Sequence, residues 1–109
     1  MLLLDVASNS MSGEIPASLG QLAYLQFLFL NRNSFSGQIP YELSGLKELD
    51  IAMFDKNDFV GTVGDMCTVG VGPESLDHFV TDCGITCDCC TDCCDDSDSS
   101  CNSDTYLAN

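Results

Sequence analysis

Eight cysteines near the C-terminus are the residues of this chain best equipped for chemistry. An even number of clustered cysteines is typical of a disulfide framework, although the spacing does not determine which cysteines pair. Disulfides persist in oxidising compartments, so the cluster predicts an extracellular or secretory-pathway protein. The cysteines are Cys67, Cys83, Cys87, Cys89, Cys90, Cys93, Cys94 and Cys101.

A thiolate metal site is the alternative use of these cysteines. The closely spaced cysteines from Cys87 to Cys94 would offer soft sulfur ligands to zinc or copper(I). Flanking carboxylates such as Asp88 and Asp92 would add negative charge to thiolates, and no Lys or Arg follows Lys56. Disulfides are therefore favoured, and neither a metal nor another cofactor is expected. A cysteine-rich metal-binding protein remains the alternative function.

Other catalytic or ion-binding patterns are weak. His78 is the only histidine, and acid–base or nucleophilic catalysis needs partner groups within hydrogen-bond reach. The acidic run from Asp95 to Asp104 fails as an EF-hand loop, because Cys101 stands where that loop needs glycine. We expect no catalytic residues, and a disordered tail over residues 102–109.

Charge excludes further classes of function. The 109 residues carry 17 acidic and 3 basic side chains, which give a net charge of −14. Nucleic-acid binding requires clustered Lys and Arg, so no nucleic-acid partner is expected. The longest apolar stretch, Leu25 to Leu30, is far shorter than a membrane span of roughly 20 residues. All three basic residues precede Cys67, so the chain divides near residue 66.

A period of 24 residues runs through the first part of the chain. Asparagines recur at this spacing, as do glycines that follow each of them by four residues. Leucines or other apolar residues precede each asparagine at fixed offsets, as in Leu25, Leu28 and Leu30. Repeats of this length indicate a solenoid. The asparagines are Asn9, Asn33 and Asn57, and the glycines are Gly13, Gly37 and Gly61.

The full pattern, L-x-x-L-x-L-x-x-N-x-L-x-G-x-I-P-x-x-L-x-x-L, resembles the plant-type, extracellular subclass of leucine-rich repeat proteins over roughly residues 1–66. The resemblance implies an α/β-type leucine-rich repeat solenoid, a right-handed superhelix with short parallel strands on its concave face and an irregular or 3-10 convex side. A disulfide-rich, irregular C-terminal cap would follow over residues 67–101. The Cys-Cys-Thr-Asp-Cys-Cys core of this cap also resembles the C-terminal segments of leucine-rich repeat proteins in diatoms.

The asparagines and the start of the chain have structural consequences. In stacked parallel strands, the amides of Asn9, Asn33 and Asn57 would satisfy backbone groups at each bend, so we expect a buried ladder. Met1 stands at the first position of a repeat with no capping segment before it. Because solenoids need caps, we expect missing N-terminal repeats, which could also carry a membrane anchor. A truncated, non-functional fragment is therefore a second alternative.

The concave face is the expected binding surface, because the resemblance places exposed residues between the buried leucines there. Large apolar side chains and two of the three basic residues fall in these rows, as is typical of binding patches. The expected function is non-enzymatic recognition of a protein, peptide or glycan ligand. The predicted ligand-binding residues are Phe27, Phe29, Asn31, Arg32, Ile51, Met53 and Lys56.

Overall fold

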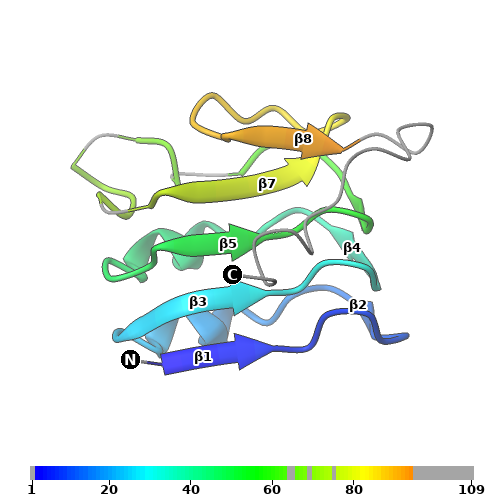
Figure 1. The fold of residues 1–109 in the computed structure, drawn as a ribbon, viewed down its shortest axis with the longest axis horizontal. Helices are drawn as coiled ribbons and strands as arrows, with labels where there is room; N and C mark the ends of the chain where they lie inside the picture. The colour runs from blue at the N-terminus through cyan, green and yellow to red at the C-terminus, as the bar shows by residue number, and fades with distance from the viewer. Residues whose placement is uncertain (1, 64–65, 69, 75, 95–109) are drawn as a thin grey trace.

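The computed structural model describes residues 2–63, 66–68, 70–74 and 76–94. The expected tail at 102–109, the acidic run from Asp95 and Cys101 lie outside these residues. Five parallel strands form one sheet in the order β1-β3-β5-β7-β8 (Figure 1). Their bounds are Leu2–Asp5 for β1, Leu25–Phe29 for β3, Ile51–Met53 for β5, His78–Asp82 for β7 and Asp92–Cys94 for β8.

The first two coils each return to this sheet through a short second strand and a 3-10 helix. The third coil has a second strand, β6. The second strands pair in parallel in the order β2-β4-β6, and the two 3-10 helices lie behind the main sheet in Figure 1. This arrangement confirms the expected solenoid with a 3-10 convex side. The bounds are Ser12–Gly13 for β2, Ala17–Gln21 for η1, Ser34–Gly37 for β4, Tyr41–Gly45 for η2 and Asp58–Phe59 for β6.

The repeated sequence explains this geometry locally. In the second coil, Leu25, Leu28 and Leu30 are almost completely buried. Leu28 and Leu30 point to the same side because alternate side chains of an extended chain do so. Pro40 precedes η2 with φ of −61° and ψ of 136°. The proline ring holds φ near this value, so it directs extended backbone into the 3-10 turn.

The main core cluster includes buried apolar residues from Ile15 to Ile85. Phe35 and Phe59 stack on its convex side with ring centroids 6.3 Å apart. Phe54 and Phe79 meet edge to face at 5.5 Å, a favourable aromatic geometry. Cys87 and Cys90 pack against the same core, so the cysteine-rich region closes the last layer of the solenoid.

The sheet continues into the region where an irregular cap was expected. In β7, His78 pairs with Ile51, Phe79 with Ala52 and Val80 with Met53, in parallel, and β8 pairs with β7 in the same direction. The repeat pattern resumes after 27 residues rather than 24, because Leu76 takes the repeat position of Leu49. Strand β7 is therefore a further repeat strand whose spacing hid it in the sequence.

Candidate functional site

Rows of side chains cross the concave face of the main sheet, as the strand register defines. One row runs through Leu3, Phe27, Ile51 and His78. Leu3 is 57% exposed, whereas Phe27 and Ile51 are half-buried. Leu3, Phe27 and Ile51 form a partly exposed apolar strip across three neighbouring strands.

A second row lies next to this strip and is less accessible. It contains Phe29, Met53 and Val80, which are 6%, 0% and 1% exposed and pack together as a separate cluster. The rings of Phe27 and Phe29 stack with centroids 6.4 Å apart. Of the predicted ligand-binding residues, Phe29 and Met53 are therefore placed to support the strip, while Phe27 and Ile51 reach its surface.

The turns after β3 and β5 carry the remaining predicted binding residues. Asn31 is buried, Arg32 is exposed and Lys56 is half-buried. Arg32 and Lys56 have φ of 60° and 61°, in the left-handed region, as does Ser8 at the equivalent position of the first coil. The backbone thus places both basic residues at the same point of consecutive coils.

Asp82 is a residue of this turn region that the sequence did not single out. Its carboxylate accepts hydrogen bonds from the backbone N–H groups of Lys56, at 2.7 Å, and Asn57, at 3.0 Å. In the preceding coil, the N–H of Arg32 donates instead to the backbone carbonyl of Asp55. Asp82 stands six positions after Leu76, as Asp55 stands six positions after Leu49, so the longer spacing before β7 also concealed this role.

The repeated asparagines hold the bends between coils together. The amide nitrogen of Asn57 donates to the carbonyls of Leu30, Phe54 and Asp55, and its oxygen accepts from the N–H of Phe35. Asn33 makes the equivalent contacts one coil earlier. Both side chains are half-buried, whereas Asn9 is exposed and bonds only within its own turn, to the carbonyls of Val6 and Ala7, among the contacts the structure describes.

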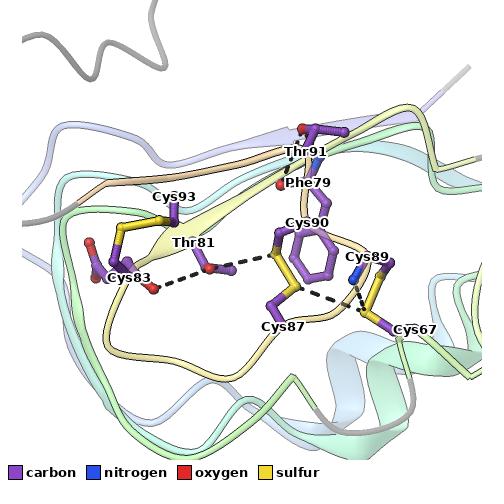
Figure 2. Close-up of a disulfide and its surroundings, with 10 residues drawn as sticks. Cys67, Phe79, Thr81, Cys83, Cys87, Cys89, Cys90, Thr91 and Cys93 are labelled. Carbon is purple, nitrogen blue, oxygen red and sulfur yellow. Dashed lines mark hydrogen bonds between the residues drawn. A yellow bond between two sulfur atoms is a disulfide. The ribbon is translucent and has the colours of Figure 1, made fainter.

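Three disulfides lie in the described part of the cysteine-rich region. Cys67 pairs with Cys89, Cys83 with Cys93, and Cys87 with Cys90 (Figure 2). The side chain of Cys94 and all of Cys101 lie outside the described residues. The sulfurs of Cys67, Cys87 and Cys89 lie within 4.8 Å of one another, but all three are oxidised and so do not offer the thiolates that a soft metal binds.

A cavity of about 350 Å³ borders one of these disulfides. Cys67 and Cys89 form part of its wall, together with Met66, Pro73 and Leu76. Its apolar wall and its size suit a small molecule rather than a protein. Within the described residues, no helix has the length and the apolar character needed to cross a membrane.

Comparison with known proteins agrees with this geometry. The Leucine Rich Repeat family matches residues 24–46, which run through β3, β4 and η2 and so form one whole coil. No curated protein matches the sequence.

Several solved structures are similar to the chain, and two of them show the extent of the similarity. The crystal structure of PEPR1–AtPEP1 has a TM-score of 0.68 and 23% identity over 79% of this chain and 12% of that one. The BIR2 ectodomain from Arabidopsis thaliana has a TM-score of 0.62 and 25% identity over 75% of this chain and 42% of that one. This chain therefore spans less than half the length of either. From its stacked parallel coils, its asparagine bends and the matched repeat, the chain has the fold of a leucine-rich repeat solenoid with a disulfide-bonded C-terminal region.

Proposed function

We propose that this chain is a non-enzymatic recognition module that binds a protein or peptide ligand on its concave face. The observation that carries the proposal is the partly exposed apolar strip of Leu3, Phe27 and Ile51 across three strands. Exposed Arg32 lies at the end of the same surface. An apolar centre with a charged edge is typical of protein-binding patches.

The solenoid would present this surface rigidly. Hydrogen-bonded strands hold the strip in place, and the buried row of Phe29, Met53 and Val80 packs along its side. A surface that is already ordered loses little conformational entropy when it binds. The ligand would contact the accessible residues Phe27, Ile51, Arg32 and Lys56. Their positions would be fixed by the buried residues Phe29, Met53 and Asn31. A glycan ligand is less well supported, because the strip is apolar.

We further propose an extracellular or secretory location. Three described disulfides support it, because such bonds persist in oxidising compartments. The similarity to the BIR2 ectodomain also supports it. A longer parent protein with additional repeats fits the small share of both solved structures that this chain covers.

Peptide selection against the intact, oxidised chain tests the binding surface. Peptides enriched from a random displayed library would be measured against wild type, Phe27→Ala/Arg32→Ala, and the control Tyr41→Ala. Tyr41 is 66% exposed and lies in η2, away from the concave strands. We expect the double variant to weaken binding by about tenfold or more, which corresponds to the loss of about 1.4 kcal/mol at one hot spot.

The control decides the interpretation. Peptides that lose affinity for Tyr41→Ala but bind the double variant like wild type would place the binding surface on the convex side and overturn the proposal. Circular dichroism of both variants would establish that the solenoid stays folded.

A further inference from the structure

Two of the disulfides are in contact with each other. The Cys67–Cys89 and Cys87–Cys90 bonds lie side by side (Figure 2), with 3.9 Å between the Sγ atoms of Cys67 and Cys87. Thiol–disulfide exchange proceeds when a thiolate sulfur attacks a disulfide sulfur. Cys67 is therefore positioned to attack the neighbouring bond as soon as its own disulfide opens.

The outer disulfide of this pair is open to a small thiol. Cys89 is exposed, and both Cys67 and Cys89 border the cavity of about 350 Å³. Because Cys89 is exposed and Cys67 is half-buried, Cys89 is the one that an incoming thiolate would attack, which makes Cys67 the leaving group. The cavity gives a molecule of that size a place to approach from.

The backbone favours Cys67 as the leaving group. The N–H of Cys89 donates a hydrogen bond to the Sγ atom of Cys67 at 3.0 Å. A hydrogen bond to a sulfur that is becoming negative stabilises that charge and speeds its departure. The contact exists before any reaction, so no rearrangement is needed to form it.

The inner disulfide has a matching feature. Cys87 and Cys90 are half-buried and pack against the core, so a thiol from solvent reaches them less readily. The hydroxyl of Thr81, a residue only 1% exposed, lies 3.6 Å from the Sγ atom of Cys90. That hydroxyl donates to the backbone carbonyl of Asp82 at 3.2 Å, and it could turn its one proton to Cys90 when that sulfur becomes a thiolate.

We propose that these four cysteines form a thiol–disulfide exchange site that accepts a small external thiol and passes the opening of one disulfide to the other. In the first step, the external thiolate bonds to Cys89, the Cys67–Cys89 bond breaks, and Cys67 leaves as a thiolate. In the second step, Cys67 bonds to Cys87, the Cys87–Cys90 bond breaks, and Cys90 leaves as a thiolate. The number of disulfides is conserved in each step, and the electron pair moves from the external thiolate to Cys90.

The exchange would connect the surface with the core of the last coil. Cys90 lies beside Thr81 of β7, and both cysteines of the inner bond contact the core cluster. Opening the inner bond and forming Cys67–Cys87 would therefore change how the final coil is closed. The site is independent of the proposed concave binding surface, which uses none of these residues.

The test is to map thiols and disulfides after exposure to cysteamine. This monothiol carries a positive charge, which suits the acidic surroundings of Glu74 and Asp88. The oxidised chain would be treated with one equivalent, quenched in acid, alkylated, digested with pepsin and analysed by mass spectrometry without reduction. We expect cysteamine on Cys89, a new Cys67–Cys87 bond and alkylated Cys90.

Other products would overturn the proposal. Alkylated Cys67 with an intact Cys87–Cys90 bond means that the opening is not passed on. Cysteamine on Cys67 means that the wrong sulfur is attacked. Exchange at the exposed Cys83–Cys93 bond alone, in the same digest, means that the outer disulfide is not an entry point.

A variant separates the relay from direct attack on the inner bond. In Cys67→Ala/Cys89→Ala, the inner disulfide remains but the entry point is gone. The rate of Cys90 alkylation is expected to fall at least tenfold relative to wild type. An unchanged rate would show that cysteamine opens the inner bond directly. The wild-type map stands by itself should this variant fail to fold.

Discussion

Arg32 and Lys56 occupy backbone positions that side chains with a Cβ atom usually avoid. Their φ values of 60° and 61° lie in the left-handed region, which costs roughly 1–2 kcal/mol for an ordinary residue. Two sets of hydrogen bonds hold these turns. In the turn that contains Lys56, the side chain of the following Asn57 donates to the carbonyl of Asp55. In both turns, acceptors of the next coil bind backbone N–H groups. For Lys56, the next coil contributes the carboxylate of Asp82 rather than a carbonyl.

Replacing Asp82 should therefore weaken the last turn. Asp82→Ala removes the acceptor for the N–H groups of Lys56 and Asn57, and we expect a loss of about 1–3 kcal/mol in the free energy of unfolding. Asp82→Asn keeps one side-chain oxygen and should lose less. Urea denaturation measures both.

Asp58→Ala is the matched control, because Asp58 is an exposed aspartate in β6. Its stability should stay within about 0.5 kcal/mol of wild type. If Asp82→Ala were as stable as this control, the capping role of Asp82 would be wrong.

At the scale of elements, close stacking of the two 3-10 helices sets the spacing of the coils on the convex side. A Cβ atom added at Gly20 in η1 would collide with the backbone carbonyl of Glu42 in η2. The absence of a side chain at Gly20 therefore allows the two 3-10 helices to approach each other this closely. Gly45, in η2, has no such restriction, since its nearest neighbour, the carbonyl of Gly20, would lie 3.6 Å from an added Cβ.

These two glycines give a paired prediction. Gly20→Ala should lower the free energy of unfolding by about 1–3 kcal/mol, because backbone atoms must move apart to admit the methyl group. Gly45→Ala should change the free energy of unfolding by no more than about 1 kcal/mol. The change should be stabilising, because alanine reduces the conformational entropy of the unfolded chain. Thermal unfolding of the two variants measures the difference, and equal stability would contradict the proposed packing.

The sequence predicts the regular elements well and the last strands poorly. Asn9, Asn33 and Asn57 mark each bend at a constant spacing, so the first three coils follow from the period alone. The sequence does not predict strand β7, because its pattern begins three residues later than the period requires. Phe79 and Thr81 also stand where leucines are expected. The register of β7 is set by its pairing with β5, which is distant in sequence, so residue spacing alone does not reveal it.

The concave surface shows a similar limit. The sequence places Phe27 and Phe29 in exposed rows, yet only Phe27 is partly accessible in the structure. A row assignment gives the direction of a side chain, whereas its accessible area depends on how neighbouring rows pack. Disulfide pairing was also beyond prediction, because it depends on which sulfurs the fold brings together.

At the scale of the whole molecule, repeats and cysteine-rich region form one continuous structure. The main sheet runs without interruption from β1 to β8, and one core cluster includes residues from Ile15 to Ile85. The composition of the sequence divides near residue 66, but the packing does not. We therefore expect the described residues to unfold as one cooperative unit rather than as two domains.

Removal of the Cys83–Cys93 bond tests this unity. The bond links Cys83, which directly follows β7, to Cys93 in β8 with a sequence separation of 10. Cys83→Ser/Cys93→Ser should cost about 2–3 kcal/mol through the unfolded state. In a cooperative unit, amide hydrogen exchange should also accelerate in β3, two strands away. Unchanged protection in β3, with faster exchange confined to β7 and β8, would show that the end of the solenoid opens separately.

The longer spacing before β7 also indicates where this solenoid tolerates inserted residues. Leu76 follows Leu49 by 27 residues instead of 24, yet the hydrogen-bonded register of β5 and β7 is unbroken. The extra residues are absorbed between β6 and β7, in a stretch where Val71 is 40% exposed and its N–H closes a turn to Thr68. A label or an epitope inserted beside Val71 would thus extend a natural length variation, leaving the strands free to serve as a scaffold.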